Sequence, residues 1–227
     1  MKNLFDIDQW KIIQSKFDPE KQLQAESIFS IGNGSFGQRA NFEEHYSGIS
    51  HQGSYLGGIY YTDKTKVGWW KNGYPEYFAK VLNSCNWIGV DFWINETKVD
   101  LNKLKIVSFT RTLDMKKGIL NRKNTFMVNE KDSVEMEFTR FCSMKENEVG
   151  AICVKIKAIN FDAKLRVKVY LNGKVYNNDS NYNELFWNKQ KTHVEAYKGT
   201  VCTSTKKTNF IQSTSMEFSI EHQSNNQ

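Results

Sequence analysis

Apolar and polar residues alternate along much of this chain, with the period of two that a β-strand produces. The clearest example is Val134, Met136 and Phe138, which alternate with charged and hydroxyl residues. The same alternation occurs in residues 88–94, 152–158, 165–171 and 216–220. Because every second side chain is apolar, we expect each segment to be a strand with one buried face and one face in water.

Short polar segments separate these strands at the distances typical of hairpin turns. They are residues 129–132, residues 160–162, Asn172-Gly173 and Lys198-Gly199. Half-buried strands joined by short turns are typical of antiparallel sheets, and their number favours two packed sheets over one exposed sheet. The pattern predicts an all-β fold, a large antiparallel β-sandwich in one domain over residues 1–222. Residues 223–227 are then a polar tail or the start of a continuation.

Gly32, Gly34 and Gly37 follow a short apolar run at the spacing of a dinucleotide-binding loop. Such a loop binds pyrophosphate only where a helix begins within it, because the helix N-terminus supplies the N–H groups. Residues 38–54 contain two more glycines and show no helical spacing of apolar residues. The glycines are therefore expected to allow a tight strand-to-strand turn and close backbone packing, with no phosphate bound.

Composition narrows the class of protein. Hydrophobic residues make up 39% and charged residues 25% of the 227 residues, as in ordinary soluble folded proteins. The net charge is +6, but the lysines and arginines are interleaved with aspartates and glutamates along the chain. Because the positive charge is not concentrated, we expect no nucleic-acid partner. The four cysteines form no C-x-x-C pair, which favours reduced thiols and argues against zinc. No metal or cofactor is predicted.

Residues 1–8 include acidic side chains where a signal peptide would need an apolar core, and no apolar run is long enough to span a bilayer. We therefore expect a cytoplasmic protein with no membrane partner.

Tyrosine, tryptophan and glycine residues crowd the segment 55–78. Aromatic side chains on such loops can stack on sugar rings while amide and carboxylate groups bind the hydroxyls. Alternatively, they cover one end of the sandwich or fill an interface, where tyrosine and tryptophan are enriched. The candidate sugar-binding residues are Trp69, Trp70, Asn72, Tyr74 and Glu76.

No residue pattern in the chain predicts a catalytic pair. Glu43 and Glu44 would point to opposite faces of an extended segment, so only one could enter a cleft, and we expect both to be solvated. Arg111 and Asp114 are expected to form a structural ion pair at a strand end.

Two histidines and a serine in the same part of the chain also carry no chemistry that we can predict. His45 and His51 have no third metal ligand nearby and are interpreted as polar loop residues. Ser35 lacks the G-x-S-x-G spacing of a nucleophile elbow.

Longer strings of residues are more specific than these spacings. Segments 26–39, 41–44, 46–48, 52–55, 67–78 and 111–115 together resemble the N-terminal domain of glycoside hydrolase family 65, of the maltose phosphorylase and trehalose phosphorylase type. The likeness covers most of the chain and is strongest up to about Asp114. One departure is Ala40, where the family pattern leads us to expect glycine.

The resemblance implies a β-sandwich of the galactose-mutarotase-like supersandwich type, followed by a helical linker, an α/α-barrel catalytic domain and a small β domain. In that family the general acid and the phosphate-binding groups lie in the barrel, which this chain is too short to contain. No catalytic residue is therefore expected here, and the aromatic loop would edge the active site of the barrel.

The full-length protein would then carry out inverting phosphorolysis of an α-glucosidic disaccharide, maltose or trehalose, giving β-glucose 1-phosphate and glucose. Inorganic phosphate would be the co-substrate, no cofactor would be needed, and a homodimer is expected. Two alternatives stay open: a free-standing carbohydrate-binding module, and a family 65 hydrolase in place of a phosphorylase.

Overall fold

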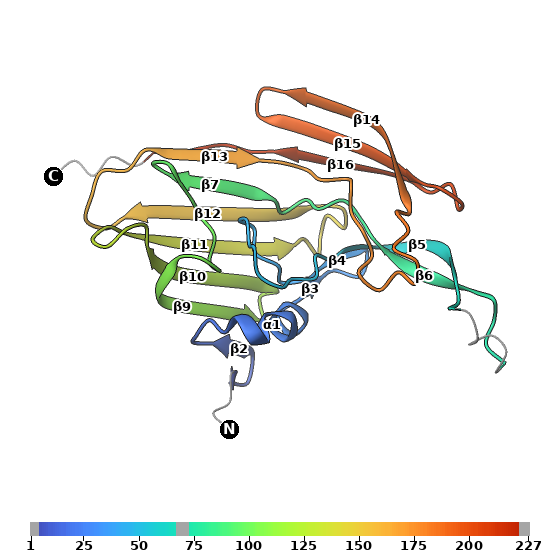
Figure 1. Ribbon diagram of the computed structural model, residues 1–227, viewed down its shortest axis with the longest axis horizontal. Helices are drawn as coiled ribbons and strands as arrows, with labels where there is room; N and C mark the ends of the chain where they lie inside the picture. Colours follow the sequence, from blue (N-terminus) through green and yellow to red (C-terminus); the bar gives the residue numbers. More distant parts are fainter. Residues whose placement is uncertain (1–4, 67–72, 223–227) are drawn as a thin grey trace. The chain divides into compact units, whose positions relative to one another are not determined.

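The computed structural model describes residues 5–66 and 73–222 (Figure 1). The chain forms two compact units, each built from separate stretches of sequence. The first unit contains residues 1–58 and 88–169, and the second contains residues 59–87 and 170–227. Each unit is described by itself.

The larger sheet of the first unit has six strands, all antiparallel, in the order β1-β2-β9-β10-β11-β12. Its strands are β1 (Asp6–Ile7), β2 (Lys11–Gln14), β9 (Lys105–Asp114), β10 (Ile119–Met127), β11 (Ser133–Cys142) and β12 (Gly150–Ala158). The turn between β10 and β11 falls at the predicted residues 129–132. Asn129 stabilises this turn because its Oδ1 accepts hydrogen bonds from the N–H groups of Lys131 and Asp132, both at 2.9 Å.

A smaller sheet of the same unit has the order β13-β7-β8, with strands β13 (Leu165–Val169), β7 (Val90–Ile94) and β8 (Thr97–Lys98). The apolar face of β7 and the apolar face of β11 contribute to one buried cluster, which also contains Phe109 and Phe126 of the larger sheet. Figure 1 shows β7 and β13 beside the strands of the larger sheet. The predicted antiparallel sandwich, with alternating buried and exposed residues, is therefore confirmed in this unit.

A short helical segment lies between β2 and β3, and the sequence did not predict it. A 3-10 turn, η1 (Pro19–Lys21), leads into the helix α1 (Gln22–Ile28). The carboxylate of Asp18 accepts a hydrogen bond from the N–H of Glu20 at 3.0 Å and so caps this start. Ala25 and Phe29 are fully buried in a second cluster with side chains from β9 and β10.

The glycine-rich segment forms a hairpin between β3 (Ile31–Gly32) and β4 (Phe36–Gln38). Gly34 has a φ of +88°, which L side chains rarely adopt, and a Cβ at Gly32 would lie 3.1 Å from the carbonyl oxygen of Phe36. Residues 39–53 form neither helix nor strand. The predicted tight turn with close backbone packing is confirmed.

The strand β5 (Ser54–Lys64) begins in the first unit, where it pairs with β4, and ends in the second. In the second unit it is followed by β6 (Tyr77–Asn83), its neighbour in the sheet order β3-β4-β5-β6. A separate antiparallel sheet of this unit contains β14 (Trp187–Glu195), β15 (Lys198–Thr205) and β16 (Ile211–Glu217). The buried apolar cluster of the second unit consists of Tyr61, Leu82, Val175, Phe186 and Trp187.

Three predicted turns differ from the structure. Residues 160–162 connect β12 of one sheet to β13 of the other, so they form no hairpin. Asn172 forms an isolated antiparallel bridge with Asn86, and no hairpin turn follows it. The turn expected at Lys198-Gly199 lies two residues earlier, where Ala196 adopts a φ of +43°. Turn residues mark a change of direction, but they do not determine which strand pairs next.

The last predicted strand is also displaced. The strand β16 runs from Ile211 to Glu217, and Ile220 lies beyond it with 66% of its surface exposed. Pairing with β15 determines this register, since Gly199 lies opposite Met216. Neither helix in the described ranges is long and apolar enough to cross a membrane.

Candidate functional site

The loop between β5 and β6 carries the predicted sugar-binding residues. Trp69, Trp70 and Asn72 lie outside the residues that the structure describes. Tyr74 is 63% exposed, and the side chain of Glu76 is 61% exposed. These two residues present an aromatic face and a carboxylate to solvent, which are the groups that a sugar would need. Whether they bind a sugar stays a prediction.

The ends of this loop are held together by hydrogen bonds. The N–H of Thr65 donates to the carbonyl of Glu76 at 2.8 Å, and its hydroxyl donates to the carbonyl of Pro75 at 2.5 Å. Two residues from the irregular segment before β14 add to this closure. Tyr182 donates its hydroxyl to the carbonyl of Thr65 at 3.2 Å, and the amide of Asn181 donates to the carbonyl of Lys64 at 3.0 Å. The base of the loop is therefore fixed to the body of the second unit.

A buried polar cluster lies along the same strands. Lys80 on β6 is 3.0 Å from the carboxylate of Asp63 on β5, and both side chains are buried. Tyr61 on β5 donates its hydroxyl to Glu184 at 2.7 Å. Burial, together with this bond to Glu184, raises the pKa of Tyr61, so the phenol stays protonated. Lys80 pairs with Asp63, and Tyr61 pairs with Glu184. The Lys80–Asp63 pair joins the two strands that carry the loop.

A second polar network, in the first unit, is buried between the segment 39–53 and the large sheet. Glu43 and Glu44 are 4% and 3% exposed, so the prediction that they are solvated was wrong. Arg122 on β10 binds both: Nη2 lies 2.9 Å from Glu43, and Nη1 lies 2.7 Å from Glu44. Arg140 on β11 lies 3.2 Å from the second oxygen of Glu43. Both carboxylates therefore face the same arginine, because this segment is irregular and not an extended strand.

The two carboxylates differ in their electrostatic environment. Burial alone would raise the pKa of Glu43, but the charges of Arg140 and Arg122 outweigh it, so that pKa is lowered. Burial raises the pKa of Glu44, which shares Arg122 with its neighbour and pairs with no second arginine among residues 5–66 and 73–222. The Arg122 guanidinium also lies 3.9 Å from the ring centroid of Phe138 and 4.6 Å from that of Phe42. This arrangement binds a loop to a sheet and presents no carboxylate to solvent.

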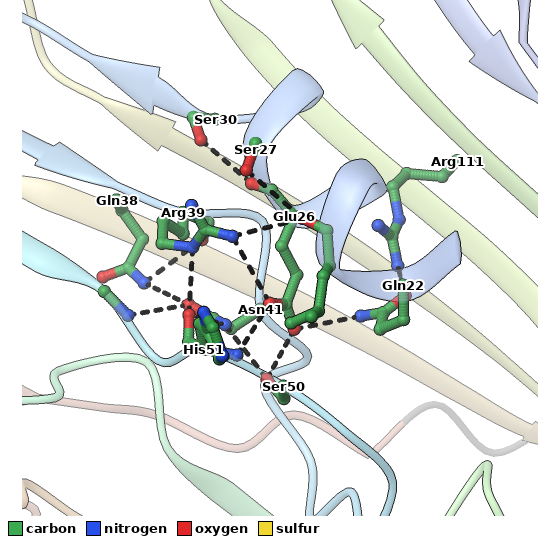
Figure 2. A network of polar contacts seen from close by, with 12 residues as sticks. Gln22, Glu26, Ser27, Ser30, Gln38, Arg39, Asn41, Ser50, His51 and Arg111 are labelled. Carbon is green, nitrogen blue, oxygen red and sulfur yellow. Dashed lines mark hydrogen bonds and ion pairs between the residues drawn. The ribbon is translucent and has the colours of Figure 1, made fainter. Parts of the chain in front are cut away.

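Figure 2 shows how the same irregular segment is attached to α1. Glu26 on α1 is fully buried, and its carboxylate accepts hydrogen bonds from the hydroxyl of Ser50 and from the N–H of His51, the latter at 3.0 Å. Arg39 lies 3.6 Å from the same carboxylate and donates to the carbonyl of His51 at 3.0 Å. His51 therefore contributes through its backbone, and α1 determines the path of the chain after the hairpin.

Arg111 joins this network and not the ion pair predicted with Asp114. Its side chain is 1% exposed, and its Nη2 donates to Gln22 on α1 at 3.2 Å (Figure 2). Asp114 instead accepts a hydrogen bond from the N–H of Lys117 at 3.0 Å. The two side chains differ because residues 111 and 114 are an odd number apart on β9 and so point to opposite faces. Burial lowers the pKa of Arg111 to about 9, and the nearby Arg122 charge adds to that effect.

The remaining candidate groups are dispersed. In residues 5–66 and 73–222, no three histidine, cysteine, aspartate or glutamate side chains are placed to hold a metal ion. His45 lies 3.9 Å from the buried carboxylate of Asp100, whose carbonyl accepts hydrogen bonds from the N–H groups of Lys103 and Leu104. The buried arginines were missed because an arginine in a strand is usually solvent-facing. Their signal in the sequence is the phase of the alternation, because Arg111, Arg122 and Arg140 each occupy a position on the buried face of their strand.

Comparison with known proteins identifies the family of this arrangement. The family described as glycosyl hydrolase family 65, N-terminal domain, matches residues 12–227. A maltose phosphorylase from Bacillus subtilis (strain 168) is 42% identical over 202 residues, which is 89% of this chain and 27% of that protein. An alpha,alpha-trehalose phosphorylase from Thermoanaerobacter brockii is 30% identical over 92% of this chain and 28% of its own length.

A solved structure to which kojibiose phosphorylase activity is attributed, from the human microbiome, has a similar fold. It superposes with a TM-score of 0.85 over 98% of this chain and 29% of its own, at 24% identity. The chain thus spans less than a third of the length of each relative that it matches here.

Proposed function

This chain belongs to glycosyl hydrolase family 65 as its N-terminal domain, and we propose from this that it is the non-catalytic β-sandwich of a longer disaccharide phosphorylase. The observation that carries the proposal is the 42% identity to a maltose phosphorylase over 89% of the chain. The geometry supports it, because Glu43 and Glu44 bind buried arginines and are not exposed to a substrate. We assign the catalytic groups to the α/α-barrel that would follow.

The reaction that we propose for the full-length protein is inverting phosphorolysis. A glutamic acid in the barrel protonates the glycosidic oxygen while inorganic phosphate attacks the anomeric carbon from the opposite face. The bond to the leaving sugar breaks as the bond to phosphate forms, which gives β-glucose 1-phosphate and glucose. We propose maltose as the first substrate to test, because identity to the maltose phosphorylase is 42% against 30% for the trehalose phosphorylase.

The test is an assay of the full-length protein with maltose, trehalose or kojibiose, in the presence and absence of phosphate. We expect glucose and a phosphate ester from maltose, with a β-anomeric signal by NMR and no turnover without phosphate. Equal release of glucose without phosphate would instead identify the hydrolase alternative. No turnover of any α-glucosidic disaccharide would contradict both.

We propose that the loop between β5 and β6 edges the active site of that barrel, with Trp69, Trp70, Asn72, Tyr74 and Glu76 as rim residues. The fixed base of the loop and the exposure of Tyr74 and Glu76 support this proposal. In the full-length enzyme, Tyr74→Ala should raise KM for the disaccharide. Tyr197→Ala is the matched control, because Tyr197 is 61% exposed in another loop of the same unit. Equal kinetics for both variants would contradict the rim assignment.

A carbohydrate-binding module is the second candidate function, favoured by the exposed Tyr74 of the same loop and the exposed Tyr77 at the start of β6. Titration of the chain with maltose and trehalose, followed by tryptophan fluorescence, separates the two. A saturable change at millimolar sugar supports binding by this domain itself, and a flat titration contradicts it.

We further propose a cytoplasmic homodimer. Cys85, Cys142, Cys153 and Cys202 are all unpaired thiols, as is usual in a reducing compartment. The mass of the full-length protein by light scattering tests the dimer, and a monomeric mass would contradict it.

A further inference from the structure

A small cavity lies inside the first unit, between the irregular segment 39–53 and the large sheet. Its volume is about 10 Å³, and every residue that lines it is buried. Arg111, Glu43 and Asn41 contribute polar groups to its wall, and Ala40 lies beside them. A cavity needs roughly 10–15 Å³ to hold one water molecule. The space therefore corresponds to a single small molecule.

One strong donor in that wall lacks a partner. The Nη1 atom of Arg111 is buried and makes no hydrogen bond to any described protein atom, although Nη2 of the same guanidinium donates to Gln22. Buried polar groups are nearly always paired, and an unpaired donor on a charged group is especially unfavourable. A buried guanidinium that lines a cavity and has a free N–H thus indicates that something accepts from it there.

We propose that this cavity is a binding site for one ordered water molecule, which accepts a hydrogen bond from Nη1 of Arg111 and donates one to the carboxylate of Glu43. A buried water of this kind makes roughly two to four hydrogen bonds. Asn41 also lines the cavity, but its side-chain amide is already bonded to Gln38, Ser50, His51 and Gly53, so Arg111 and Glu43 are the two partners that the proposal assigns. The water gives Arg111 the contact to Glu43 that its own side chain does not make.

The charges around the cavity favour water over a small anion. Arg111 and Arg122 alone would attract a halide, but the acidic residue Glu43 lines the same space. Arg122 already donates to Glu43, Glu44 and Asn124, so it has little left to offer an anion. A halide would lie against a negative group, whereas water donates to the carboxylate and accepts from the guanidinium.

This water would add a link between two networks that Arg140 already joins, because Arg140 pairs with Glu43 and donates to the carbonyl oxygens of Arg39 and Asn41. Arg111 bonds to the α1 side through Gln22, while Glu43 bonds to β10 and β11 through Arg122 and Arg140. An oxygen at Nη1 also stabilises the charged form of Arg111, whose pKa burial lowers to about 9. The water thereby gives the cation a further partner at the junction of helix, loop and sheet.

Oxygen-17 magnetic relaxation dispersion of the whole protein that carries this chain tests the proposal, because it counts long-lived internal waters. Arg111→Met should remove one such water relative to the wild type. Val99→Ile is the control, since Val99 is fully buried in the same unit and does not line the cavity. The proposal is overturned if Arg111→Met retains the wild-type number of long-lived waters.

A crystal structure of the unmodified protein, soaked in bromide, gives a second test that needs no folded variant. We expect a water-sized density peak at roughly 2.7–3.2 Å from Nη1 of Arg111, with no anomalous signal. An anomalous bromide peak at that position would make the site an anion site and overturn the proposal. A cavity without density would overturn it as well.

Discussion

At the scale of single residues, the guanidinium of Arg122 is the centre of the buried network. It lies 78 residues along the chain from Glu44, binds two adjacent carboxylates, and stacks on Phe138. Removal of the cation would leave both carboxylates buried in the protein interior with Arg140 as the one remaining arginine beside them. The neighbouring Lys123 offers a comparison, because its side chain is half exposed and pairs with Glu135 at 3.0 Å.

We predict that Arg122→Met lowers the free energy of unfolding by about 3–5 kcal/mol, the usual cost of breaking a buried ion pair from one side. Lys123→Met should cost less than about 1 kcal/mol, as expected for an exposed pair. Urea unfolding followed by circular dichroism measures both. Equal losses for the two variants would mean that the buried pairing contributes little.

Glu43 should also make stability depend on pH. Its folded pKa is lowered by Arg140 and Arg122, whereas an unfolded glutamate titrates near about 4.3. Its contribution is therefore complete above the unfolded pKa and is lost as the pH falls through the folded value. We predict that the stability advantage of the wild type over Glu43→Gln is constant from pH 7 to about 4.5 and narrows below that. A gap that stays constant down to pH 3 in urea titrations would contradict this assignment.

At the scale of elements, the β3–β4 hairpin determines how the glycine-rich segment is used. Asn33 makes the turn, since its Oδ1 accepts hydrogen bonds from the N–H groups of Ser35 and Phe36, both at 3.0 Å. Gly34, between Asn33 and Ser35, supplies the positive φ of this turn. Gly37 is different: a Cβ there would meet only the carbonyl of Ile31, at an ordinary distance of 3.6 Å.

We predict that Gly34→Ala lowers the free energy of unfolding by about 1–2 kcal/mol, because an L side chain is strained at this φ. Gly37→Ala is the matched control and should change it by less than about 0.5 kcal/mol, since nothing there requires glycine. Thermal or urea unfolding of the two variants provides the measurement. The turn assignment would fail if Gly37→Ala proved the more damaging change.

Elements with a clear period were predictable from sequence, and elements defined by distant partners were not. The strand with Val134, Met136 and Phe138 was found because its alternation is strict and its apolar face is buried. The helix α1 has seven residues and few apolar ones, so its short pattern does not stand out. The burial of Glu43 and Glu44 depends on arginines contributed by β10 and β11, which no local spacing in the sequence reveals.

At the scale of the whole molecule, the two units differ in the size of their buried cores. Among the residues that the structure describes, the first unit contains two clusters of buried apolar residues, and the second contains one smaller cluster. Each unit also contains one buried cysteine, Cys142 in the first and Cys85 in the second. Burial raises the pKa of each of these thiols to about 11, which keeps them protonated and slow to react.

We predict that Cys142 becomes reactive to a thiol reagent at a higher urea concentration than Cys85, because the larger core stabilises the first unit more. Pulsed alkylation followed by peptide mass spectrometry measures each site. Cys153 is the control and should react without urea, because it is exposed. Labelling of Cys85 at the same or a higher urea concentration than Cys142 would contradict a difference in stability between the units.

The chain passes between the two units three times, after Gly58, after Trp87 and after Val169. The N-terminal part of a protein leaves the ribosome first, so residues 59–87 emerge before the segment 170–227 that completes their unit. They cannot pack against that segment while β9 to β13 of the first unit are being synthesised. The last strand of the first unit ends at Val169, so this unit can finish folding while the rest of the second is still being translated. During synthesis, the exposed β5–β6 segment is therefore the part of the nascent chain that most needs protection from aggregation.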